Sequence, residues 1–368
     1  MKHVIITSYK EIQKLHFIPT IIIGFYQGGY ENVFLETATR LKTAFVDVDI
    51  IGSSSESNLM HTLPHVDYES DFPCLFMCTD VKRQSYTLAY YDNNTFPDVK
   101  LLKKKTYATF LLHTLNQHSH NYIETLLKQY HSTPSANLIF GAVAGAPDVN
   151  AKTSLYFNGK FLEEGHTILW SIDQQYYHVD TISIHDFDPI GAKMEITKTQ
   201  NNTLIEIDYK PALKAIETIC GTLTEESIEA YDHPFFIYNS KNSVSYYQPL
   251  SSIKSIDREA QTITMFKQPN AEDTLQLAIP FSREKQEVQL QKFKRYHKDN
   301  AFALLFVCIA YKGHWKDMES IYLMQLSKSL EVPYIGLHSF GEIGPFNFSE
   351  PSQMQNQTIT LAVFSEKA

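Results

Sequence analysis

The sequence predicts an α/β protein with two lobes, in which strand–helix–strand units at both ends of the chain are related as a pseudo-repeat and flank a strand-rich middle. Three observations support this prediction. The same order of strand, glycine turn, helix and strand occurs near residues 21–52 and 303–336, and turn dipeptides break the intervening chain into short strands. In addition, 368 residues are more than one ordinary core needs, which favours two lobes.

The first unit begins with an apolar strand at 21–27, followed by a glycine turn and a helix. One apolar stripe marks the helix, and it consists of Phe34, Ala38, Leu41 and Phe45. A second strand at 46–52 then enters a serine-rich loop. Because a strand–helix–strand crossover joins parallel neighbours, we expect these two strands to pair in parallel beneath the helix.

The middle of the chain carries hairpin signals. Asn158-Gly159 predicts a two-residue turn, and Asn201-Asn202 joins two stretches that alternate apolar and polar residues. Pro211 opens a short helix that Gly221 closes. We place the lobe boundary there, which gives an N-terminal lobe of residues 1–211 and a C-terminal lobe of residues 212–368. Further strands are expected at 235–238, 262–266 and 275–279, and a polar helix at 282–296.

The second unit contains a strand at 303–310, a turn at 312–314, a helix at 318–330 and a strand at 332–336. Its glycines keep the spacing of those in the first unit. Ligands of open α/β sheets collect beyond the carboxyl ends of the strands. We therefore expect the loops at 52–58, 310–316 and 336–345 to lie around one shared hollow.

Composition argues against several classes of function. A net charge of −9, without a long basic run, disfavours a nucleic-acid or anionic-membrane surface. The longest apolar run, at 301–310, is too short to insert across a membrane. The first residues do not resemble a signal peptide, and the four cysteines, Cys74, Cys78, Cys220 and Cys308, are too scattered for a disulfide framework. We expect a cytoplasmic protein.

Several motifs together resemble a known family. Residues 51–55 (Ile-Gly-Ser-Ser-Ser), 141–145 (Gly-Ala-Val-Ala-Gly), 304–308 (Leu-Leu-Phe-Val-Cys), 341–345 (Gly-Glu-Ile-Gly-Pro) and 356–358 (Asn-Gln-Thr) are similar to the signature stretches of the two-part FIST sensor proteins, over roughly residues 20–364. The resemblance implies an N-terminal and a C-terminal FIST domain that sense a small metabolite such as an amino acid. It also implies output through a partner protein, for example a histidine kinase or a cyclase, because the two halves use the whole chain.

Two positions depart from the family pattern. Members often have a glycine and an acidic residue where this chain has Glu56 and Ser57, and often an arginine where it has Tyr311. Since arginine can clamp a carboxylate with two hydrogen bonds, its absence weakens the case for a ligand with an acidic head group.

The candidate ligand-binding residues lie in the loops of the two units and in the second glycine-rich segment. They are Gly52, Ser53, Ser54, Ser55, Glu56, Gly141, Gly145, Cys308, Tyr311, His314, His338, Ser339, Gly341 and Glu342. Serine hydroxyls supply neutral donors and acceptors to a polar ligand. Glu342 could pair with an ammonium group or brace the glycine turn, and Cys308 could be a sensor thiol or a buried inert one; the sequence leaves both choices open.

Two alternatives have distinct chemistry. The protein could be a haem-binding nitric-oxide sensor, as the resemblance implies for some relatives, with His314 or His338 as the axial ligand; otherwise we expect no cofactor and no metal. It could instead be a hydrolase or transferase using Ser54 or Cys308, although no Gly-x-Ser-x-Gly elbow is present and we predict no catalytic residues. Of the remaining residues, His61, His65, His113, His118 and His120 are expected at the surface, and Cys74 and Cys78 in the core.

Overall fold

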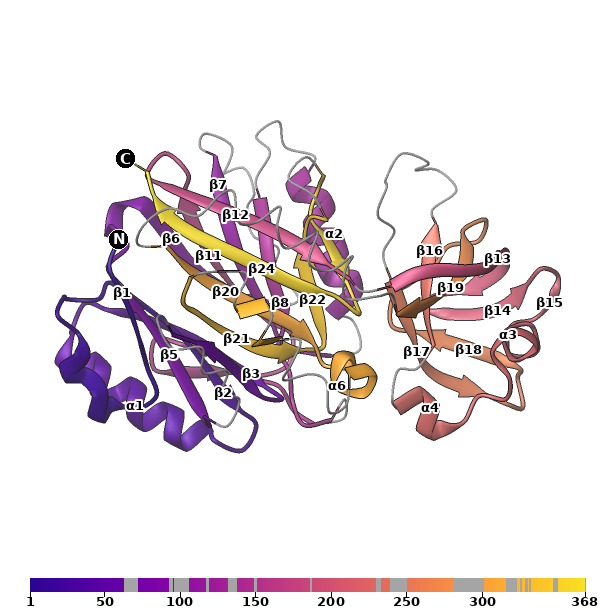
Figure 1. The fold of residues 1–368 in the computed structure, drawn as a ribbon, viewed down its shortest axis with the longest axis horizontal. Coiled ribbons are helices and arrows are strands. Elements are labelled where there is room, and N and C mark those ends of the chain that lie inside the picture. The colour runs from indigo at the N-terminus through magenta and orange to yellow at the C-terminus, as the bar shows by residue number, and fades with distance from the viewer. Residues whose placement is uncertain are drawn as a thin grey trace.

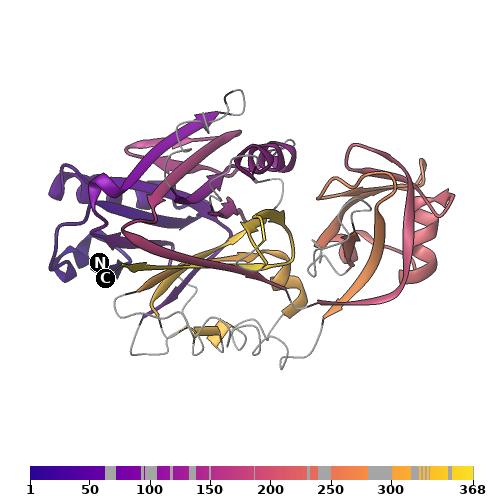
Figure 2. The same ribbon diagram turned by 90° about the horizontal axis from the view of Figure 1, so that it is seen from above.

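The computed structural model confirms the α/β class. It describes residues 1–62, 72–92, 95, 106–116, 119–131, 138–148, 151–185, 187–229, 233–238, 250–280, 301–315, 323, 324, 326, 327, 330, 332–346 and 350–367. These residues form a large body of three mixed sheets and a smaller β body, made of residues 187–280, that stands beside it (Figures 1 and 2). Within the described residues, no helix has the length and apolar character needed to cross a membrane.

The first sheet contains the predicted N-terminal unit. Its strands, in order, are β1 (His3–Ile6), β5 (Cys74–Thr79), β2 (Ile21–Gln27), β3 (Asp49–Ser55), β9 (Leu155–Phe157) and β10 (Lys160–Leu162). β2 and β3 pair in parallel and are joined by helix α1 (Glu31–Ala44), as predicted. The predicted turn between β9 and β10 is also present, with positive φ of 45° at Asn158 and 104° at Gly159.

The second sheet contains the C-terminal unit. Its order is β12 (Tyr177–Ile184), β24 (Ile359–Glu366), β20 (Phe302–Cys308), β21 (Tyr334–Ser339) and β4 (Asn58–His61). β20 and β21 pair in parallel, which confirms the predicted strands. The prediction of a turn at 312–314 is wrong, because these residues belong to helix α6 (Ala310–Trp315). Of the predicted helix 318–330, residues 323, 324, 326, 327 and 330 are helical and the others lie outside the described residues.

The third sheet contains a parallel unit that we did not predict. Its order is β23 (Gln353–Gln355), β22 (Gly341–Gly344), β8 (Leu138–Val143), β7 (Tyr107–His113), β11 (His166–Asp173) and β6 (Tyr86–Asp92). β7 and β8 are parallel neighbours connected through helix α2 (Ser119–His131). The large body is therefore built from three strand–helix–strand units, of which the sequence comparison found the outer two.

In each unit, a strand that comes later in the chain pairs with a different sheet. β4 follows β3 but pairs with β21, β22 follows β21 but pairs with β8, and β9 comes after β8 but pairs with β3, all antiparallel. This cyclic exchange links the three sheets into one ring. The predicted division between residues 211 and 212 stays a prediction, but strands from both sides of it share the second and third sheets.

The inner faces of the three sheets meet in one apolar core. Phe25 of β2, Phe110 of β7 and Phe306 of β20 come together there, with ring centroids 6.4 Å apart for Phe25 and Phe306 and 5.5 Å apart for Phe110 and Phe306. The outer faces are covered as well, by α1 on the first sheet and α2 on the third. Strands buried on both faces read as continuous apolar runs, which explains their appearance in the sequence.

The small β body contains the remaining strands. They are β13 (Phe187–Gln200), β19 (Thr274–Pro280), β16 (Pro234–Tyr238), β17 (Leu250–Asp257), β18 (Thr262–Met265), β14 (Thr203–Ile207) and β15 (Lys210–Pro211), in sheet order. The same body contains helices α3 (Ala212–Cys220) and α4 (Glu225–Glu229). The hairpin at Asn201-Asn202, the helix from Pro211 to Gly221 and the three later strands are confirmed. The helix expected at 282–296 lies outside the described residues.

Short connections complete the large body. The 3₁₀ turns η1 (Tyr9–Lys14) and η2 (Arg83–Ser85) link strands of the first and third sheets. The two ends of the described chain lie side by side in both views, where the amino group of Met1 is 2.5 Å from Glu366 Oε2 (Figures 1 and 2).

Two fully buried histidines, His61 and His113, and the half-buried His120 contradict the predicted surface placement. His61 lies in β4, His113 in β7 and His120 in α2, and His65 and His118 lie outside the described residues. The ring of His113 contacts Thr167 Oγ1 at 2.8 Å and Ser119 Oγ at 3.1 Å. Burial lowers its pKa to about 3, with smaller contributions from neighbouring histidines. Cys74 and Cys78 are in the core, as predicted.

The low pKa of His113 predicts acid sensitivity. Because the unfolded chain takes up a proton below about pH 6.5 and native His113 does not, stability should fall by about 1.4 kcal/mol per pH unit as pH drops from 6.5 towards 4. Replacing His113 with glutamine should make the free energy of unfolding less steeply dependent on pH over this range. Urea titrations at several pH values measure this, and the same substitution at exposed His16 is the control; equal slopes in all three proteins would refute the prediction.

Candidate functional site

The carboxyl ends of three strands meet at one junction. The backbone nitrogen of Glu56, after β3, donates to the carbonyl of His338 in β21 at 3.4 Å, and that of Gly145, after β8, donates to Ser54 in β3 at 3.1 Å. Phe340, after β21, donates to Val143 in β8 at 3.2 Å. Each strand end thus bonds to the next, so the predicted meeting of the two repeat units occurs, with the third unit included.

The junction is tightly packed, so the prediction that the strand-end loops surround a shared hollow is wrong at this point. A Cβ atom on Gly145 would overlap the carbonyl oxygen of His338 and lie 3.0 Å from the nitrogen of Glu56. Ser54 Oγ donates to the Gly145 carbonyl at 2.9 Å and accepts from the nitrogen of Ser154 at 3.0 Å. The hydroxyls therefore hold the protein's own backbone, which is a structural role for the serine-rich segment.

The other members of the first loop are also engaged within the protein. Ser53 Oγ donates to the Ser54 carbonyl at 3.0 Å, and Ser55 Oγ donates to the carbonyl of Ser57. Gly52 leaves room for the ring of Phe34, which a Cβ atom would meet at 2.7 Å. Gly52 therefore permits close packing of α1 on the sheet.

A polar cluster borders the junction. His338 is 1% exposed, and its Nδ1 lies 2.7 Å from Ser57 Oγ and 4.0 Å from Glu56 Oε2. Glu56 in turn forms an ion pair with Lys312 of α6. Two predicted residues, Glu56 and His338, are thus brought together by strands from opposite ends of the chain.

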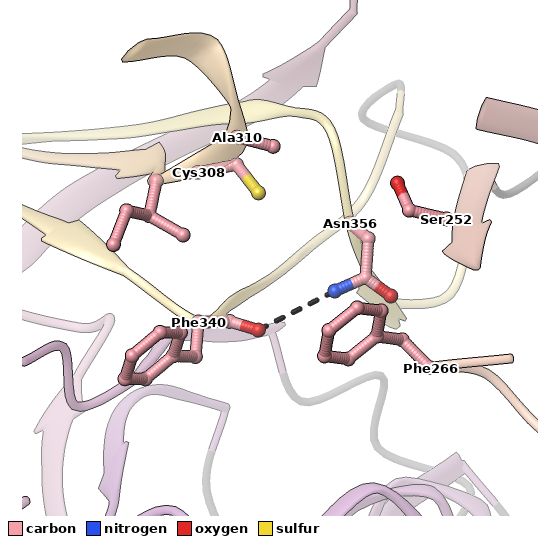
Figure 3. A pocket seen from close by; sticks show the side chains of 7 residues that line it. Ser252, Phe266, Cys308, Ala310, Phe340 and Asn356 are labelled. Atoms are coloured by element: carbon pink, nitrogen blue, oxygen red, sulfur yellow. Dashed lines mark hydrogen bonds between the residues drawn. The ribbon is translucent and has the colours of Figure 1, made fainter. Parts of the chain in front are cut away.

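A separate cavity lies where the small β body approaches the large one. It is lined by Ser252 and Phe266 from the small body and by Cys308, Ile309, Ala310, Phe340 and Asn356 from the large body. We call it the interbody cavity. Figure 3 shows the Cys308 sulfur directed into the space, the rings of Phe340 and Phe266 along the opposite side, and the Asn356 amide donating to the Phe340 carbonyl at 3.4 Å.

The interbody cavity is narrow in this structure. Only about 10 Å³ of it can hold the centre of a water molecule. That volume corresponds to about one water. A larger molecule therefore requires the walls to separate.

Glu342 of β22 is fully buried near the cavity. Its Oε1 accepts from Ser339 Oγ at 2.6 Å and its Oε2 from Thr358 Oγ1 at 2.8 Å. Burial raises the pKa of Glu342 to about 8, against the opposing effect of these hydrogen bonds. Burial, reinforced by the Glu342 carboxyl group, also raises the pKa of Cys308. At neutral pH the Cys308 thiol is therefore uncharged, and the Glu342 carboxyl group is protonated in most molecules.

The remaining predicted residues occupy different places. Tyr311 is buried and its hydroxyl donates to the Gln357 carbonyl at 3.1 Å, so it braces the loop behind the cavity. Gly141 sits against the Leu111 carbonyl with φ of 149°, and Gly341 lies under the side chain of Met354. His314 belongs to α6, but its side chain lies outside the described residues. Among the thirteen predicted residues other than His314, all of which the structure describes, only Cys308 lines the interbody cavity.

Sequence reasoning missed four polar or aromatic cavity residues: Ser252, Phe266, Phe340 and Asn356. Asn356 could have been predicted as a candidate site residue, since it belongs to one of the motifs on which the family resemblance rests. No sequence pattern marks Ser252 or Phe266 as a site residue, because both belong to the small body and reach the cavity only through tertiary packing.

A match to a family model assigns the chain to a protein family. The FIST N domain model matches residues 20–210, just over half of the 368 residues. The chain belongs to the FIST family. FIST domains are sensory domains, and the chain accordingly has a sensory role. No curated protein matches the chain. In this FIST protein the matched range covers the first unit, the unpredicted middle unit and the start of the small body.

The described residues do not fit a haem on His338. The His338 ring is buried and its Nδ1 contacts Ser57 Oγ at 2.7 Å. His338 is not among the residues that line the interbody cavity, and that cavity holds about one water rather than a porphyrin. Among the described residues there is also no cluster of three or more histidine, cysteine or acidic groups suited to a metal ion. A haem on His314 stays an untested prediction.

Proposed function

We propose that this FIST protein binds a small polar metabolite, such as an amino acid, in the interbody cavity, and that occupancy changes how a downstream signalling protein docks. The observation that carries the proposal is the position of the cavity, with walls from both bodies at the carboxyl end of β20. Binding sites occur preferentially between domains and beyond the carboxyl ends of parallel strands.

The chemistry of the walls supports a ligand with both apolar and polar parts. Phe266, Phe340 and Ile309 provide apolar contact, while Asn356 and Ser252 supply hydrogen-bonding groups. The nearby Glu342 carboxyl group is mostly protonated at neutral pH. A ligand ammonium group close to it would favour its ionised form, so Glu342 is the candidate partner for an amine.

Separation of the walls provides the route to a signal. In this structure the cavity has room for about one water, so a larger ligand binds an arrangement in which the small body has moved. A ligand shifts an equilibrium only when it binds one arrangement more tightly than the other. We propose that the shifted small body is what a partner protein recognises, and we propose ligand binding rather than catalysis as the role of the site.

A thermal-shift screen tests this function. Amino acids, organic acids and nucleotides are added singly to the full chain, and a ligand at about 100 times its Kd should stabilise the protein by about 2.7 kcal/mol. Replacing Cys308 with methionine puts a larger side chain into the interbody cavity and should abolish the shift. The same replacement at Cys220, on α3 of the small body, should leave it intact.

Two outcomes would count against the proposal. One is the absence of any stabilising compound across the panel. The other is a compound whose stabilisation is equal in the wild type, in the Cys308→Met protein and in the Cys220→Met protein, because that ligand must bind elsewhere.

A further inference from the structure

Polar contacts bridge the two bodies beside the interbody cavity. Glu124 of α2, in the large body, has its Oε1 atom 3.3 Å from Nζ of Lys267 in the small body. Lys267 directly follows Phe266, which lines the cavity. The Lys267 side chain is 14% exposed and that of Glu124 32%, so the ion pair is partly shielded from water. Figures 1 and 2 show α2 on the side of the large body that faces the small one.

A second contact lies at the cavity wall. Gln357 Nε2, in the loop before β24, donates to Oγ of Ser252 in the small body at 2.7 Å. Ser252 itself lines the cavity. The ion pair and this hydrogen bond therefore join the bodies next to the two residues, Phe266 and Ser252, that the small body contributes to the site.

α2 also reaches the cavity through Asn356. His120 lies one helical turn before Glu124, on the same face of α2, and is hydrogen-bonded to Asn356. Burial lowers the pKa of His120 to about 4, so its ring is neutral above that pH. For Glu124, burial would raise the pKa, but the charge and hydrogen bond of Lys267, with help from Lys128 and His120, lower it. Glu124 is thus an anion facing Lys267.

We propose that the Glu124–Lys267 ion pair is a latch that holds the small body against the large one and keeps the interbody cavity narrow, and that its release widens the cavity for a ligand. This inference rests on the proposed function for its biological meaning, but the latch can be tested without any ligand. Cys308 serves as the reporter, because it lines the cavity and the residue is 4% exposed in this structure.

The experiment measures alkylation of Cys308 in the native full chain. Iodoacetamide is added to a Cys220→Ser background, which removes the more exposed thiol, and mass spectrometry of peptides follows Cys308 separately from Cys74 and Cys78. Lys267→Met or Glu124→Gln should speed alkylation of Cys308 by about tenfold, as expected for loss of a partly buried ion pair. Reversing both charges, Glu124→Lys with Lys267→Glu, should bring the rate back towards that of the background protein.

Lys128→Met provides the matched control. Lys128 is also paired with Glu124, at 3.9 Å, but both residues are on α2, so this pair does not join the two bodies. Its removal should leave the alkylation rate of Cys308 unchanged. Equal rates in the background, Lys267→Met and Glu124→Gln proteins would overturn the latch, as would a charge-reversed protein that alkylates as fast as the single variants.

The outcomes separate the latch from the proposed function. Faster alkylation in the single variants supports the latch even if no compound in the thermal-shift screen binds. Conversely, a compound that binds in the cavity while all variants alkylate at one rate would support the proposed function and refute the latch.

Discussion

Replacing Gly145 with alanine should lower the free energy of unfolding by about 4 kcal/mol. The added Cβ would overlap the carbonyl oxygen of His338, which itself accepts a hydrogen bond from Glu56. Backbone cannot rotate away as a flexible side chain can, so β8 and β21 must separate at the junction. Urea unfolding followed by circular dichroism measures the change.

Gly221 offers a control with a different kind of constraint. Its φ is 81°, but a Cβ atom there would have no neighbour within 4 Å. Its ψ is −174°, a combination that is essentially restricted to glycine, so Gly221→Ala should cost only the backbone strain, about 1–3 kcal/mol. Equal losses at Gly145 and Gly221 would show that the three strand ends are not held as closely as the structure indicates.

Replacing Glu342 with glutamine should change how stability depends on pH. The pKa of Glu342 is raised from 4.5 to about 8 in the folded protein. Between these pH values the Glu342 carboxyl group holds a proton in the native state that it has lost in the unfolded chain. Its contribution to the free energy of unfolding is therefore fully present below pH 4.5 and is lost as the pH rises through about 8. Relative to Glu342→Gln, the wild type should lose about 1.4 kcal/mol per pH unit across this window.

The measurement is a set of urea titrations from pH 5 to pH 8.5. Glutamine keeps the size of the side chain and stays neutral, so the variant should lack this slope while remaining folded. Glu36→Gln, in an exposed i,i+4 pair on α1, is the control and should follow the wild type. Parallel curves for the wild type and Glu342→Gln would mean that the Glu342 carboxyl group is not held protonated.

The sequence predicted those parts of the fold that rest on local pattern. The strand–helix–strand units around β2 and β20 and the turn at Asn158-Gly159 all follow from periodicity and turn chemistry within a few residues. The middle unit was missed although α2 has an apolar stripe, which includes Tyr122, Leu126 and Tyr130. The histidines near the start of this helix were interpreted as surface residues, whereas His120 is hydrogen-bonded to Asn356. Tertiary hydrogen bonding overrides that reading.

The candidate site was predicted only in part. The meeting of strand ends was correct, because parallel crossovers put them at one edge. The filled state of the junction could not be foreseen, since the partners of Ser54 and Gly145 come from other sheets. The cavity itself needs Ser252 and Phe266, which a separate body brings in over long distances in the chain.

The most direct test of this account is a crystal structure of the full chain with a compound selected by the thermal-shift screen. We predict electron density for the compound between Asn356 and Cys308 on one side and Ser252 and Phe266 on the other, with the small body displaced from the position seen here. Density for the compound at any other place, with the interbody cavity still closed around a single water, would contradict the claim that this cavity is the sensing site.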